Sequence, residues 1–198
     1  MAIGTRPDCV PGDVLALLDS YGRGGRYVSL ELGLQSLRDE ALDFYERGHS
    51  VAEGLDAVER ALRFPNLNVS AHLMFGAPGD TLQDAIACAR KMSELGVHGV
   101  KIHQLMVLKD TILAERYARK AWPLLELDEF NHMAMAFLEH LDPSIHVERT
   151  HALSTHADEL VGPKWSALRF QPMDALKKMM KDNESYQGKA LGHARCAS

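Results

Sequence analysis

Cysteines and histidines are the side chains that would reveal a metal centre, and neither set has a metal-binding pattern. The chain has three cysteines: Cys9, Cys88 and Cys196. They are far apart and odd in number, so they match neither a disulfide framework nor a C-x-x-C motif, and we expect unpaired, reduced thiols. His146, His151 and His156 would be an alternative metal site, but they lack both the i, i+4 spacing of a helical zinc pair and accompanying cysteines. The sequence therefore predicts no metal site within this chain.

Polar residues at the ends of predicted strands are better candidates for chemistry. They occur in residues 5–8 (TRPD), 33–36 (GLQS), 76–79 (GAPG) and 103–105 (HQL). In parallel α/β sheets, chemistry gathers at the carboxyl ends of the strands, so we expect these stretches to meet at one edge. No grouping of Ser or Cys with His and Asp falls on these ends, which gives an independent hydrolase little support.

The spacing of apolar residues alternates between the period of a strand and that of a helix. In residues 27–35 (YVSLELGLQ), Val28, Leu30, Leu32 and Leu34 alternate with polar or small residues, which predicts a strand with one polar face. Further strands are predicted over residues 68–75, 99–106 and 145–149, and residues 2–4 resemble the exit of another.

Helices are predicted between these strands. Capping boxes begin at Ser36, Ser50 and Thr81, each marking the start of a helix. Other helices are predicted over residues 11–21, 128–141 and 173–181. Strands separated by helices imply right-handed crossovers and a parallel sheet, so the predicted fold class is α/β.

Composition limits the function classes. With 198 residues, 46% of them hydrophobic and 25% charged, the chain has material for one globular core. A formal net charge of −5 argues against a general nucleic-acid-binding surface. No apolar run approaches the length of a membrane span and the start is not a secretory signal, so we expect a cytoplasmic protein that has no membrane partner.

The strand-end sequences, taken in chain order, resemble those of a known superfamily. They are GTRPD, ELGLQS, RGH, HLMFGAPGDT and GVKIHQLMVLKDT. In this order they resemble the radical-SAM superfamily, and within it the bacterial Fe–S oxidoreductases related to the Elongator catalytic subunit. The resemblance runs from Ile3 to about Thr111 and thins to scattered matches beyond. It implies a TIM-like partial barrel of parallel βα units.

The resemblance also implies cofactors. In the family, a C-x3-C-x2-C loop holds three irons of a 4Fe–4S cluster, S-adenosylmethionine chelates the fourth, and its cleavage yields a 5′-deoxyadenosyl radical. This sequence contains no such triplet and begins near the end of what resembles the third strand. We therefore expect the carboxyl-terminal half of the barrel, with a truncated half barrel over residues 1–150 and a helical family-specific extension over 151–198. Such a chain would neither bind the cluster nor cleave S-adenosylmethionine alone.

Five residues match positions that embrace the nucleoside in relatives: Gln35, Arg47, His72, Met74 and Gly76. The resemblance implies that the Gln35 amide binds the ribose and that the Arg47 guanidinium meets the methionine carboxylate. His72 stands where relatives often have an acid or another polar ribose partner. Met74 would line the adenine, and Gly76 would let backbone approach the ligand. No catalytic residue is assigned.

Each of these residues also has a purely structural interpretation. Gln35 could cap the next helix, and Arg47 could be a cation complementing a helix dipole. His72 and His103 point inward from their strands, where a lone histidine is more often a hydrogen-bonded core residue than a ligand-binding one.

Two function classes follow. The first is a radical-SAM-like fragment that keeps a nucleoside half-site and works with a cluster-bearing partner chain. The second is a half barrel reused for assembly, in which a homodimer covers the open sheet edge and the apolar surface beside it. Nucleoside binding through Gln35 and Arg47 distinguishes the two.

Overall fold

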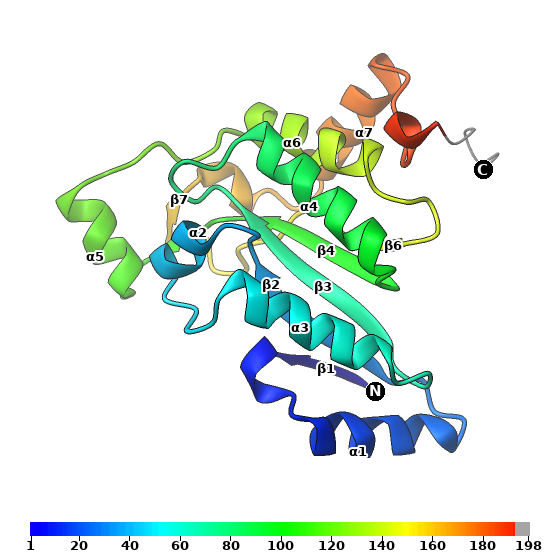
Figure 1. Ribbon diagram of the computed structural model, residues 1–198. Helices are drawn as coiled ribbons and strands as arrows, with labels where there is room; N and C mark the ends of the chain where they lie inside the picture. Colours follow the sequence, from blue (N-terminus) through cyan, green and yellow to red (C-terminus); the bar gives the residue numbers. More distant parts are fainter. Residues whose placement is uncertain (193–198) are drawn as a thin grey trace.

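A five-stranded parallel sheet forms the centre of the protein (Figure 1). The computed structural model describes residues 1–192. The strand order is β1-β2-β3-β4-β6, and every neighbouring pair is parallel. The bounds are β1 Ala2–Thr5, β2 Ser29–Gln35, β3 Asn68–Phe75, β4 Gly99–Gln104 and β6 His146–Arg149. The α/β class with a parallel sheet, predicted from the sequence, is confirmed.

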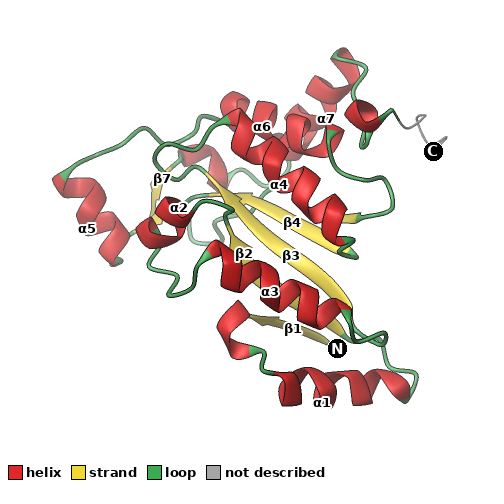
Figure 2. Ribbon diagram, viewed as in Figure 1, coloured by secondary structure: helices red, strands yellow, loops and turns green. Residues whose placement is uncertain are grey.

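Helices connect the strands and cover one face of the sheet. Their bounds are α1 Gly12–Arg23, α2 Asp39–Phe44, α3 Val51–Leu62, α4 Leu82–Leu95, α5 Ile112–Arg119, α6 Leu127–Glu139 and α7 Gln171–Asp182. Figure 2 shows α3 and α4 on the same side of the sheet, and α6 packs against α4. Among residues 1–192, none of these helices combines the length and apolarity needed to cross a bilayer.

Strand alternation separates an apolar face from a polar one. Leu30 and Leu32 of β2, Leu73 of β3 and Ile102 of β4 are fully buried against the helices. The intervening residues, such as Glu31 and His72, therefore lie on the opposite face of the sheet. This is the polar strand face that the sequence pattern predicted.

Helix capping agrees with the sequence at two of the three predicted boxes. Ser50 and Thr81 each accept a hydrogen bond from the third backbone N–H of the following helix, which returns a carboxylate to the cap. The box predicted at Ser36 was wrong. The Ser36 hydroxyl instead accepts from the Arg38 backbone N–H at 3.1 Å, and α2 begins at Asp39.

One helix and a pair of short strands were not predicted. α5 extends away from the sheet in Figure 1 and has no buried residue. β5 (Val107–Leu108) and β7 (Leu160–Gly162) form an antiparallel pair. Because β7 pairs with β5, and α7 packs against α6, part of the predicted extension contacts the preceding half barrel. A boundary at residue 150 remains a prediction.

Candidate functional site

Gln35 and Arg47 meet over Gly33 at the carboxyl end of β2. A Cβ atom placed on Gly33 would lie 2.9 Å from Gln35 Nε2 and 3.0 Å from Arg47 Nη2, so glycine is needed for this close approach. Arg47 Nη2 also donates a hydrogen bond to the Gly33 carbonyl oxygen at 3.2 Å. The structure thus brings together two of the five residues predicted to bind the nucleoside.

Both side chains keep unused polar atoms. Gln35 Oε1 and Arg47 Nε are buried and have no hydrogen-bond partner among the described residues. Gln35 has a φ of 66°, a left-handed conformation that non-glycine residues rarely adopt and that is common at functional sites. Unsatisfied buried groups are costly, and a ligand that hydrogen-bonds to them would remove that cost. The pair therefore fits a polar ligand such as a nucleoside.

Gln35 is not a helix cap, and Arg47 does not lie within the last turn of a helix, so neither has the purely structural role that the sequence allowed. Arg38, and not Gln35, is the N-cap residue of α2. Arg47 lies beyond the last turn of α2, which ends at Phe44. Burial lowers the pKa of Arg47, and the neighbouring Arg6 adds to this effect while Asp8 opposes it. The guanidinium remains the charged donor that a carboxylate would require.

Met74 lies beside Arg47 in a cavity of about 390 Å³. The cavity is also lined by Leu105 and Met106, which follow β4, and by Ile112 and Arg116 of α5. Arg116 forms an ion pair with Glu46, which ties α5 to the chain next to Arg47. A lining that combines apolar side chains with a few charged ones is typical of a small-molecule site.

Gly76 begins a turn that is held by one carboxylate. Its φ is 113°, a conformation that favours glycine. Asp80 Oδ2 accepts hydrogen bonds from the backbone N–H groups of Gly76 and Ala77, at 2.8 and 2.9 Å, while Arg38 Nη1 donates to Asp80 Oδ1 at 2.7 Å. These contacts fix the turn at the end of β3. Both carboxylate oxygens of Asp80 accept hydrogen bonds, whereas Gln35 Oε1 has no partner among the described residues.

His72 belongs to a network of charged side chains on the polar face of the sheet. Its Nε2 atom lies 2.9 Å from Glu31 Oε2, and Lys101 Nζ lies 2.5 Å from the same oxygen. Lys101 Nζ also lies 3.3 Å from Glu148 Oε2, and the Ser70 hydroxyl donates to Glu148. We call these five residues the sheet-face network.

Electrostatics keeps the histidines of this face neutral. The hydrogen bond from Lys101 lowers the pKa of Glu31 most strongly. Burial is the largest cause of the lowered pKa of His72, and Lys101 adds to it, while Glu31 opposes both. Burial lowers the pKa of His103 to about 4. At neutral pH Glu31 is thus ionised, and the imidazoles of His72 and His103 are uncharged.

The histidines considered as an alternative metal site do not come together. His151 Nε2 lies 2.9 Å from Asn131 Oδ1, and its ring packs against Phe130 and Trp165. Within residues 1–192, no three His, Cys, Asp or Glu side chains are arranged to hold a metal ion. Cys9 and Cys88 are free thiols, and Cys196 lies outside the described residues.

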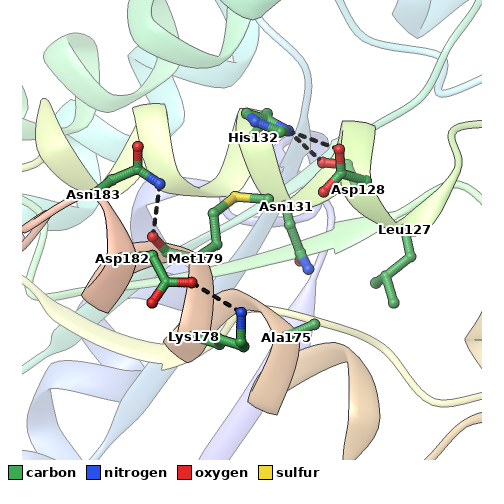
Figure 3. Close-up of a pocket in the computed structure, with 9 residues that line it drawn as sticks. All are labelled: Leu127, Asp128, Asn131, His132, Ala175, Lys178, Met179, Asp182 and Asn183. Carbon is green, nitrogen blue, oxygen red and sulfur yellow. Dashed lines mark hydrogen bonds and ion pairs between the residues drawn. The ribbon is translucent and has the colours of Figure 1, made fainter.

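A second cavity, of about 470 Å³, lies between α6 and α7 (Figure 3). Its polar side chains pair along their own helices: Lys178 with Asp182 at 2.9 Å, and His132 with Asp128 at 3.4 Å. None of the residues predicted to bind the nucleoside lines it. We therefore place the candidate site at the strand ends, not in this groove.

Sequence reasoning missed most of the sheet-face network. Glu31, Lys101 and Glu148 lie on predicted strands but were given no role. The available signal was the alternation of β2, which places Glu31 on the same face as Gly33. Their pairing depends on register between strands far apart in the sequence, for example His72 beside Lys101, and the pattern of one strand does not contain this information.

Comparison with known proteins identifies one matching domain family and several proteins of similar sequence. The Radical_SAM C-terminal domain family matches residues 97–182. The chain is 34% identical over 192 residues to the protein YhcC of Escherichia coli, covering 97% of this chain and 61% of YhcC. It is 29% identical over 189 residues to the uncharacterised protein YtqA of Bacillus subtilis, covering 96% of this chain and 58% of YtqA.

The fold is also found in solved structures. Elp3 of Methanocaldococcus infernus, with its N-terminus deleted, superposes with a TM-score of 0.77 at 24% identity, covering 94% of this chain and 42% of the other. At that identity the likeness concerns the fold alone. The chain spans about three fifths of the length of YhcC and of YtqA. These similarities confirm the resemblance in the sequence: residues 97–182 match the Radical_SAM C-terminal domain family, and nearly the whole chain is similar to YhcC and YtqA.

Proposed function

We propose that this chain forms the nucleoside-binding half of a radical-SAM site in the cytoplasm. The observation that carries the proposal is the convergence of Gln35 and Arg47 over Gly33, each with a buried polar atom that has no partner among the described residues. Gln35 would hydrogen-bond the ribose and Arg47 would bind the methionine carboxylate of S-adenosylmethionine.

The other predicted residues complete the pocket in this proposal. Met74 contributes apolar contact for the adenine from a cavity that Arg47 also lines. The backbone at Gly76 approaches the ligand, and His72 offers a ring nitrogen to the ribose from the adjacent strand. When bound, a 4Fe–4S cluster would supply the electron for cleavage, but this sequence has no C-x3-C-x2-C triplet to hold it. The cluster ligands therefore have to come from other residues, such as those of a partner chain.

Binding of S-adenosylmethionine and of 5′-deoxyadenosine, measured by titration calorimetry, tests the proposal. We expect Arg47→Ala to weaken S-adenosylmethionine at least tenfold and to affect 5′-deoxyadenosine less, because the latter has no carboxylate. Gln35→Ala should weaken both ligands. Gln83→Ala and Arg90→Ala, at exposed positions of α4, are matched controls and should change neither. No binding by the wild-type chain would contradict the proposal.

One observation favours the assembly module as a second candidate. β1 is an edge of the sheet, with Ala2 and Gly4 exposed, and exposed strand edges pair readily with other strands. The exposed apolar side chains Leu17, Tyr21 and Tyr27 lie on or after the neighbouring helix α1. A stable dimer in light scattering, together with an absence of nucleoside binding, would support this candidate in place of the first.

A further inference from the structure

Glu31 is the centre of the sheet-face network and links three strands. Its Oε2 atom is shared by His72 of β3, at 2.9 Å, and Lys101 of β4, at 2.5 Å. Lys101 is held in turn by Glu148 of β6 at 3.3 Å. The side chains of Glu31, His72 and Lys101 are each no more than about one-fifth exposed, at 15%, 20% and 18%. Such a shielded arrangement restricts the orientation of the imidazole.

The contact with Glu31 determines which nitrogen of His72 carries the proton. An ionised carboxylate only accepts hydrogen bonds, so Nε2 of a neutral His72 has to be the donor. Nδ1 then has a lone pair and acts as an acceptor. Nδ1 has no hydrogen-bond partner among residues 1–192. The ring thus presents an unused acceptor on the polar face of the sheet.

The charges around His72 favour this neutral form. Lys101 and Arg149 on one side disfavour an imidazolium, and Glu31 favours it. His103, two residues beyond Lys101 on β4, is half-buried, and burial lowers its pKa so that it is also uncharged at neutral pH. Burial of the ring also opposes a positive charge, and together these effects outweigh the single carboxylate.

The register places His72 at the level of Gly33. β2 pairs regularly with β3 up to Leu32 and Ala71, and then resumes with Gln35 opposite Leu73. Gly33 lies in this irregular segment, at the level of His72. The Gln35 amide and the Arg47 guanidinium lie over Gly33, so these two side chains and His72 share this level of the sheet.

We propose that Glu31 is a positioning residue that holds His72 as the Nε2–H tautomer, so that Nδ1 accepts a hydrogen bond from a hydroxyl group of the ligand. This inference rests on the proposed function, because the ligand is the one bound by Gln35 and Arg47. It adds a requirement that the proposed function lacks: at this position the ligand must be a donor, as a sugar hydroxyl is, and a group that only accepts is disfavoured.

The tautomer is measured first, on the ligand-free chain with ¹⁵N-labelled histidine, with His72→Gln identifying the signals. We expect the Nε2–H form in the wild type and in Glu31→Gln, whose amide oxygen can still accept. Glu31→Ala should show a mixture of both tautomers. Glu148→Ala removes a carboxylate from the same network without touching His72 and should leave the tautomer unchanged. An Nδ1–H form in the wild type overturns the inference even if no variant folds.

Ligand preference is measured next, by comparing 5′-deoxyadenosine with its analogue that lacks both ribose hydroxyls. We expect about a tenfold preference for the hydroxylated compound in the wild type and in Glu148→Ala, and a smaller one in Glu31→Ala. An unchanged preference in Glu31→Ala overturns the inference and leaves the proposed function standing. Absence of binding by both compounds overturns the proposed function and the ligand part of this inference, while the tautomer measurement still decides the role of Glu31.

Discussion

Gly33 controls the geometry of the candidate site at the scale of single residues. Its missing side chain leaves the space into which the Gln35 amide and the Arg47 guanidinium fold. The nearest atoms to a Cβ here are the ends of two flexible side chains, and the closest backbone atom, the Thr5 carbonyl oxygen, is at 3.5 Å. An added methyl group would therefore displace the two side chains with little strain on the sheet.

Gly33→Ala should consequently fold normally but bind S-adenosylmethionine about tenfold more weakly, because Gln35 and Arg47 would have to move. Gly4→Ala is the matched control, since a Cβ at Gly4 on β1 meets nothing within 4 Å. Calorimetry for affinity and thermal unfolding for stability measure both effects. Equal affinity in Gly33→Ala and the wild type would show that the two side chains do not hold the ligand.

His103 makes stability depend on pH. Burial lowers its pKa from about 6.5 to about 4, so between these values the unfolded chain takes up a proton that the folded protein refuses. The free energy of unfolding should therefore be constant above about pH 6.5 and fall as the pH decreases toward 4. The loss is on the order of 1 kcal/mol for each pH unit crossed. His151, whose pKa burial also lowers to about 4, contributes in the same direction.

Urea unfolding across this pH range measures the effect, with His103→Gln as the variant. The amide does not titrate, so the variant should lose less stability than the wild type on acidification. His146→Gln, at an exposed position of β6, is the control and should follow the wild type. Parallel curves for His103→Gln and the wild type would contradict the assignment to His103.

At the scale of elements, local sequence determined the helix starts and ends where short-range hydrogen bonds dominate. Ser50 and Thr81 cap their helices as predicted, and Gly96 ends α4 in a left-handed conformation. The prediction at Ser36 was wrong: β2 ends at Gln35 after an irregular segment, and α2 begins only at Asp39. A local capping pattern therefore did not determine where this helix begins.

Gly96→Ala should destabilise the protein by about 1 kcal/mol, because its φ of 70° is unfavourable for a residue with a side chain. A Cβ at Gly96 meets nothing within 4 Å, so the expected effect is conformational and not steric. Gly12→Ala, at the first position of α1 with equally open space, is the control and should be neutral or stabilising. Urea unfolding of both variants measures the difference, and equal stabilities would contradict the capping role.

At the scale of the whole molecule, the parallel sheet and the face of each side chain on β2 could be predicted from the sequence, but contacts between strands could not. Alternation along β2 and β3 correctly separated the apolar face from the polar one. The resemblance selected Gln35 and Arg47, which the structure brings together over Gly33. The Glu31–His72–Lys101 contacts required the register of three strands, and the unpredicted α5 closes the cavity beside Arg47. These features depend on how distant segments meet.

The most direct measurement of the central claim is a double-mutant cycle for S-adenosylmethionine affinity, with the wild type, Gln35→Ala, Arg47→Ala and the double variant. The protein should be held at a concentration where light scattering has fixed its oligomeric state. If both side chains hold one ligand, each single variant should weaken binding at least tenfold, and the double variant should bind below detection. A double variant that binds as tightly as the wild type would contradict the claim that the strand-end site holds the nucleoside.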